Sequence, residues 1–192
     1  MATPWLDSIR NTKTLTIYRG PSAAGWSDIF TEAIMRFNTL SSKLSLNVTF
    51  VAATTPPDPN NLKGTNVQFE TADGHYSFSW LGAQGTGTLA GNANKGLTRF
   101  GLANDRIGRA FIYVPKKGQH SRFMKLCMTV HEMVHATGLE SEDHSAILNP
   151  DIFSESLVAS GDTVEAGVLN GRKMPPIWMS NDTAQKIKKL WP

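Results

Sequence analysis

Two histidines and a glutamate in the second half of the chain could carry out hydrolytic chemistry at a metal ion. The run His131-Glu132-Met133-Val134-His135 places two imidazoles four residues apart. On a helix this spacing puts both rings on one face, where they can bind the same ion. Zinc is the metal that the pattern indicates, because it accepts imidazole nitrogens. Glu132 could then serve as general base toward a water molecule and as general acid toward a leaving amine.

A third protein ligand is expected, because zinc sites that keep a position open for water commonly have three. Side chains able to bind zinc follow closely in the sequence: Glu140, Glu142, Asp143 and His144. We favour His144, since an imidazole completes a three-histidine site and a loop of modest length can bring it to the metal. Asp143 is the alternative. Glu155 also competes, at a distance from His135 that resembles the glutamate ligand of thermolysin-like enzymes, although the residues around it lack the accompanying pattern.

These side chains need a helix to present them, and the apolar periodicity predicts one over 121–137. Gly138 suits the end of that helix, where a residue with positive φ is common. The lone cysteine, Cys127, falls on the core side of the helix and is expected to pack there. A strand over 109–114, rich in apolar residues and ended by Pro115, precedes the helix.

The remaining pattern predicts an α+β fold. We expect a strand at 14–18 and then a helix to residue 40, with Ser27 or Asp28 as its N-cap. Further strands are expected at 46–53, 67–69, 76–80 and 86–88, with residues 76, 78 and 80 forming one aromatic face. Residues 139–176 are expected to be mostly loop, and Ser180 or Asn181 should cap a closing helix that runs to residue 191.

The composition limits the classes of protein that the chain can belong to. Its 192 residues suit one domain, and 40% hydrophobic with 18% charged residues is typical of a globular protein. A net charge of +3 gives no reason to expect nucleic acid as a partner. No apolar run is long enough for a membrane span, and the first residues lack the features of a signal peptide.

The stretch from His131 to Glu140 resembles the active-site helix and turn of the metzincin zinc endopeptidases, and most of all those of the matrixin branch. Residues 146–150, Ala-Ile-Leu-Asn-Pro, are similar to the matrixin Met-turn, with Leu148 at the position of its methionine. Residues 179–191 resemble the closing matrixin helix. The family's third ligand lies three residues after the glycine, and Ser141 occupies that position here.

The resemblance implies a single metzincin-like catalytic domain over 1–192, of a compact microbial or phage type, in which 151–176 is a loop insertion. It implies a twisted mixed β-sheet with an active-site helix and a C-terminal helix. In such an enzyme His131, His135 and His144 bind Zn2+, Glu132 is the general acid/base, and the partner is a protein or peptide substrate. Metzincins bind peptide as an added antiparallel strand at an exposed sheet edge, here expected at 111–113 or at 85–88.

Two other functions stay open at this point. The displaced third ligand and the missing Met-turn methionine are compatible with a non-catalytic metal-binding module that keeps the fold for a structural or interaction role. A zinc amidase that acts on cell-wall peptide would use the same chemistry on a different substrate. The retained Glu132 favours an enzyme, because a module without activity has no chemical need for a carboxylate at that position.

Overall fold

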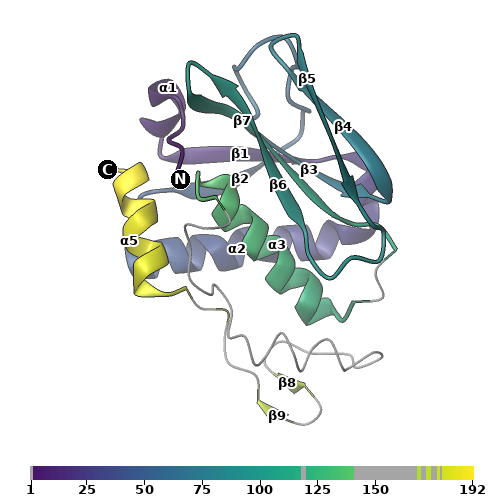
Figure 1. Ribbon diagram of the computed structural model, residues 1–192. Coiled ribbons are helices and arrows are strands. Elements are labelled where there is room, and N and C mark those ends of the chain that lie inside the picture. The colour runs from purple at the N-terminus through teal and green to yellow at the C-terminus, as the bar shows by residue number, and fades with distance from the viewer. Residues whose placement is uncertain (1, 118–119, 141–167, 170–171, 174–176, 178) are drawn as a thin grey trace.

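The computed structural model describes residues 2–117, 120–140, 168–169, 172–173, 177 and 179–192 (Figure 1). Its elements, in chain order, are α1 (Asp7–Arg10), β1 (Thr14–Arg19), the 3-10 helix η1 (Pro21–Trp26), α2 (Ser27–Leu44), β2 (Thr49–Ala53), β3 (Val67–Ala72), β4 (Gly74–Trp80), β5 (Ala83–Leu89), β6 (Leu97–Ala103), β7 (Arg106–Pro115), α3 (Arg122–Ala136), β8 (Val168–Leu169), β9 (Arg172–Lys173) and α5 (Asn181–Leu190). The predicted α+β class is confirmed.

A five-stranded sheet in the order β2-β1-β3-β7-β6 forms the centre of the fold. The pairs β1–β2, β1–β3 and β3–β7 are parallel, and only β6 runs antiparallel to its neighbour β7. The sheet is therefore mixed, as expected. Strand β7 lies between β3 and β6, so residues 111–113 are in the interior of the sheet and the expectation that they form an exposed edge is wrong.

Two hydrophobic clusters cover opposite faces of this sheet. Helices α2 and α3 pack on one face and enclose the larger core, which includes Phe37, Phe69 and Ile112. The β4–β5 hairpin lies over the other face (Figure 1). There Phe78 packs on Phe111 with ring centroids 4.8 Å apart. Because β7 is covered on both sides, it is buried along almost its whole length, as is usual for an interior strand between two layers.

Most predicted elements are present, with differences at their ends. The expected cap of α2 by Ser27 or Asp28 is wrong, because η1 continues directly into α2 and Trp26 occupies the N-cap position without a side-chain hydrogen bond. At the other end of the chain, Ser180 does cap α5 by accepting a hydrogen bond from the amide of Thr183. Strand β6, which borders the cleft described below, was not predicted.

The turn between β6 and β7 contained a signal for that strand. Asn104 and Asp105 both have left-handed backbone conformations, with φ of 50° and 58°. Two consecutive residues with positive φ are typical of a two-residue hairpin loop, and asparagine and aspartate tolerate this conformation well. The pair therefore marks a hairpin that joins β6 to the predicted strand β7.

The first and last described segments meet beside the C-terminal end of α3 (Figure 1). The backbone amide of Thr3 donates to the carbonyl of Gly138, and Trp191 packs into the same core as α3. Gly138 has φ of +114°, and a Cβ atom at this position would collide with the carbonyl oxygen of Thr3, so both its conformation and its close packing require glycine.

No helix among the described residues is long and apolar enough to cross a membrane.

Candidate active site

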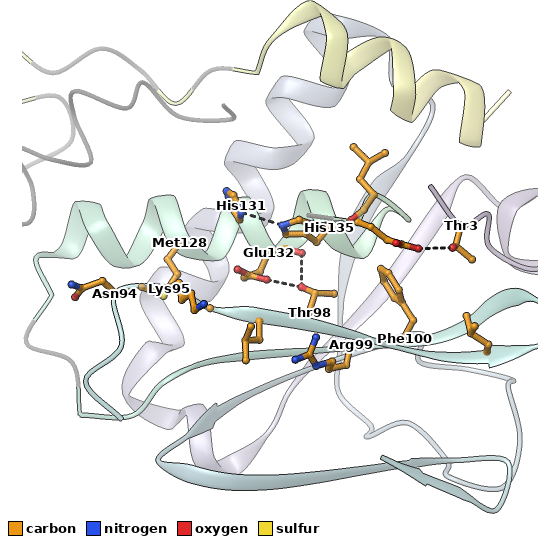
Figure 2. Close-up of a pocket in the computed structure, with 15 residues that line it drawn as sticks. Thr3, Asn94, Lys95, Thr98, Arg99, Phe100, Met128, His131, Glu132 and His135 are labelled. Carbon is orange, nitrogen blue, oxygen red and sulfur yellow. Dashed lines mark hydrogen bonds between the residues drawn. The ribbon is translucent and has the colours of Figure 1, made fainter. Parts of the chain in front are cut away.

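A cleft of about 660 Å³ lies between α3 and the edge strand β6 (Figure 2). His131, Glu132 and His135 line it from the helix, and Thr98 and Phe100 line it from the strand. The predicted helix thus presents His131, Glu132 and His135 to one cavity. Strand β6 comes close to them because its antiparallel pairing with β7 places it at the edge of the sheet, next to α3.

The two histidines hold their Nε2 atoms 3.1 Å apart. Two nitrogens on one tetrahedral zinc ion, each about 2.05 Å from the metal, are about 3.3 Å apart, which is close to the spacing found here. His135 donates through Nδ1 to the carbonyl of Leu139 at 2.7 Å. That bond leaves Nε2 of His135 as the nitrogen with a lone pair, the form in which a histidine binds a metal. The donor pair therefore fits a zinc ion.

Only two of the three predicted ligands can be placed. His144 and its alternative Asp143 lie outside the described residues, as do Ser141, Glu142, Leu148 of the Met-turn-like segment, and Glu155. Within the described part of the chain no group of three or more histidine, cysteine, aspartate or glutamate side chains could hold a metal ion. Glu140, the remaining candidate, lines the cleft and accepts a hydrogen bond from the Thr3 hydroxyl at 3.1 Å.

Glu132 is 3% exposed and faces strand β6. Its Oε2 accepts a hydrogen bond of 2.8 Å from the hydroxyl of Thr98. Burial raises the pKa of Glu132 to about 7, against smaller lowering effects of the Thr98 hydrogen bond and of the positive charges on Arg99 and Lys95. A carboxyl group with a pKa near neutrality can both accept and release a proton under ordinary conditions, which suits a general acid/base.

Two tryptophans fix the end of the helix just after His135. The indole of Trp5 donates to the carbonyl of Ala136, and that of Trp191 donates to the carbonyl of Thr137, both at 2.9 Å. The last carbonyls of a helix have no partner within the helix and need one from elsewhere when they are buried. Both indoles are buried, so these bonds hold the turn that follows His135 in one position.

Several residues of the site were not identified from the sequence. Strand β6 was not predicted, so Thr98, which lies in it, and Lys95, which lies just before it, were not identified. Trp5 and Trp191 are far from α3 in sequence, and no local pattern reveals such contacts. Tyr113, in the segment 111–113 that was expected to bind peptide, donates its hydroxyl to the carbonyl of Ser77 and stacks on Tyr76 beneath the hairpin. It does not line the cleft.

Comparison with models of known protein families gives no match for this chain. A search of curated proteins likewise finds no similar sequence.

Proposed function

We propose that this chain is a zinc-dependent endopeptidase and that the cleft between α3 and β6 is its active site. The observation that carries the proposal is the pair of Nε2 atoms of His131 and His135, which lie 3.1 Å apart in a cleft that Glu132 also lines. Two imidazoles at metal-binding separation beside a buried carboxylate form the donor set and the acid/base of a metal-dependent hydrolase. His144, or Asp143 in its place, completes the ligand set in this proposal.

Each residue then has a defined part in peptide hydrolysis. Zinc supplies Lewis-acid chemistry at such a site, by polarising a carbonyl and making water acidic near neutral pH. Thr98 holds Oε2 of Glu132 in place, and the carboxylate takes a proton from the attacking water. Glu132 then gives this proton to the amine that leaves when the peptide C–N bond breaks, and so returns to its ionised form.

The edge strand supports a peptide as the substrate. Strand β6 pairs with β7 on one side and has no strand partner on its other side among the described residues. An extended peptide could add to that free edge and hydrogen-bond to the backbone of β6. Phe100 and Leu102 border the cleft along the same strand, and Leu102 is 47% exposed, so they offer apolar surface to side chains of the substrate.

The decisive experiment compares the wild type with Glu132→Gln. We expect the wild type to cleave casein or a peptide library, to lose this activity in a chelator, and to regain it with Zn2+. The variant should keep its zinc, measured by elemental analysis, and lose cleavage by about 100-fold or more, because the amide cannot accept the proton. Asp105→Asn removes a carboxylate from the exposed β6–β7 turn and is the control, with wild-type cleavage expected.

Other outcomes would assign the chain to the alternative functions. If zinc is bound but neither protein nor cell-wall peptide is cleaved, the endopeptidase proposal is wrong and a non-catalytic metal-binding module is favoured. If peptidoglycan fragments are cleaved and proteins are not, the chain is an amidase. Cleavage by Glu132→Gln at the wild-type rate contradicts the acid/base assignment.

A further inference from the structure

The carboxylate of Glu132 is held by a short piece of the neighbouring strand. Gly96, directly before β6, and Thr98, within it, approach Glu132 from the same side of the strand. The Thr98 hydroxyl donates to Oε2 at 2.8 Å and is 3.1 Å from the backbone carbonyl oxygen of the same glutamate. Figure 2 shows both contacts as dashed lines between α3 and β6.

Gly96 makes room for this arrangement. A Cβ atom at residue 96 would lie 2.6 Å from Cγ of Glu132 and 2.9 Å from both Cδ and Oε1. Non-bonded carbons pack at about 3.5–4.0 Å, so any larger side chain here would push the carboxylate away from the strand. Gly96 does not have a positive φ, so its absence of a side chain matters for the contact with Glu132 and not for backbone conformation.

A buried carboxylate needs such a fixed partner to stay in one orientation. Glu132 is 3% exposed, so few water molecules can satisfy its oxygens, and the hydroxyl of Thr98 takes the place of one. Because Thr98 binds Oε2, the side chain has a defined rotamer, and the two oxygens are not equivalent. Catalytic groups must be held within about half an ångström of their working position to be effective.

We infer that Thr98 is a positioning residue for the general base and that Gly96 and Thr98 together form the seat of Glu132. This inference rests on the proposed endopeptidase function. Thr98 lies in the strand to which a peptide substrate would add, and Gly96 directly precedes it, so one stretch of chain sets the positions of both the base and the scissile bond. Thr98 acts through Glu132 and is not itself a catalytic residue.

The test compares three substitutions at or near this seat. Thr98→Val keeps the shape and removes the hydroxyl, Thr98→Ser keeps the hydroxyl, and Gly96→Ala adds the obstructing Cβ. We expect Thr98→Val and Gly96→Ala to lower kcat by about 10- to 100-fold with KM within about twofold of the wild type, because the base is misplaced and substrate binding is not. Thr98→Ser should recover most of the lost kcat.

Matched controls separate positioning from stability. Thr88→Val changes an exposed threonine of β5, and Gly25→Ala adds a Cβ where no atom lies within 4 Å. Both should keep wild-type kcat. Zinc content and melting temperature are measured for every variant, and the expected loss of kcat occurs with zinc content unchanged.

The possible failures are distinguishable. If the wild type shows no chelator-sensitive cleavage, the proposed function is wrong and this inference falls with it. If the wild type is active and Thr98→Val has the same kcat, only the role of Thr98 is wrong. An equal loss in Thr98→Val and Thr98→Ser, or a loss that follows melting temperature or zinc content, also overturns the inference, because the hydroxyl is then not what places the base.

Discussion

At Glu132, burial of the side chain conflicts with its charge. Its buried position raises its pKa from 4.5 to about 7, so the folded apo-protein binds a proton more tightly than the unfolded chain does. A carboxyl group with a raised pKa stabilises the fold below its unfolded pKa, and this contribution is lost as the pH rises through the folded pKa. Ionisation of Glu132 therefore destabilises the fold, and the acid/base role proposed for this residue requires the ionised form.

Glu132→Gln should therefore stabilise the metal-free protein at alkaline pH. At 1.36 kcal/mol per pKa unit, the change from 4.5 to about 7 corresponds to about 3 kcal/mol of stability lost between pH 4.5 and pH 8. Urea unfolding in a chelator should show the advantage of the variant over the wild type growing by about 2–3 kcal/mol from pH 5 to pH 8. Asp105→Asn, which removes an exposed carboxylate, serves as control; an equal change in both variants would contradict a specific effect of burial at residue 132.

The residues of the site differ in how well the sequence revealed them. His131, Glu132 and His135 lie within about one turn of a single helix, so the local sequence is enough to predict that they lie close together. The contact between Thr98 and Glu132 joins two elements, and its existence depends on the strand order that brings β6 next to α3. The pattern of residues along the sequence does not reveal the order of the strands in the sheet.

Among the elements, α3 and β6 differ in the same way in how well the sequence predicts them. Helix α3 has a strong apolar periodicity because it packs against the sheet and α2, and its predicted range of 121–137 agrees with the observed Arg122–Ala136. Strand β6 has no strand partner on one side among the described residues, and its register shifts between Gly101 and Leu102, so its residues do not alternate cleanly between apolar and polar. Apolar and polar residues alternate along a strand when one of its faces is buried. An edge strand beside a cleft is only partly buried, so this alternation is weak.

The β4–β5 hairpin supports β6 from the face opposite the helices. The indole of Trp80 donates to the carbonyl of Leu102 at 3.1 Å, and Nε of Arg99 donates to the hydroxyl of Tyr76 at 3.2 Å. Tyr76 also stacks on Tyr113 of β7, and Phe78 packs on Phe111 with tilted rings, which confirms that these aromatic residues share one face of a strand. The hairpin therefore supports the strand that borders the cleft.

Glycines of β5 leave space for the aromatic rings of β4. A Cβ on Gly87 would collide with the ring of Tyr76, which lies across from it in the register of the hairpin. Gly87→Ala should lower the free energy of unfolding by about 1–3 kcal/mol, the usual cost of overpacking. Thr86→Ala, at an exposed neighbouring position, is the control and should stay within about 0.5 kcal/mol of the wild type in the same urea titration. Equal stability of Gly87→Ala and the wild type would mean that Tyr76 does not pack on β5 as described.

In the whole molecule, segments that are distant in sequence meet at the C-terminal end of α3. Trp5 precedes β1 and Trp191 follows α5, yet their indoles bond to the carbonyls of consecutive residues, Ala136 and Thr137. Thr3 adds a backbone bond to the next residue, Gly138. The geometry of the site thus depends on parts of the chain that contribute nothing to its chemistry. The sequence shows tryptophans at both positions, but their shared target appears only once the chain is folded.

A double-mutant cycle tests whether the two tryptophans act on the helix end as a unit. Trp5→Phe and Trp191→Phe each remove one indole donor and leave a buried carbonyl without it, which should cost about 1–3 kcal/mol of unfolding free energy. The two acceptor carbonyls belong to adjacent residues, so loss of one indole should loosen the turn and weaken the hydrogen bond of the other indole. The loss of unfolding free energy in the double variant should therefore be smaller than the sum of the two single losses by about 0.5 kcal/mol or more. Trp80→Phe, at the distant hairpin, should combine additively with either change. Additive losses for Trp5 and Trp191 as well would show that each segment caps its own carbonyl independently.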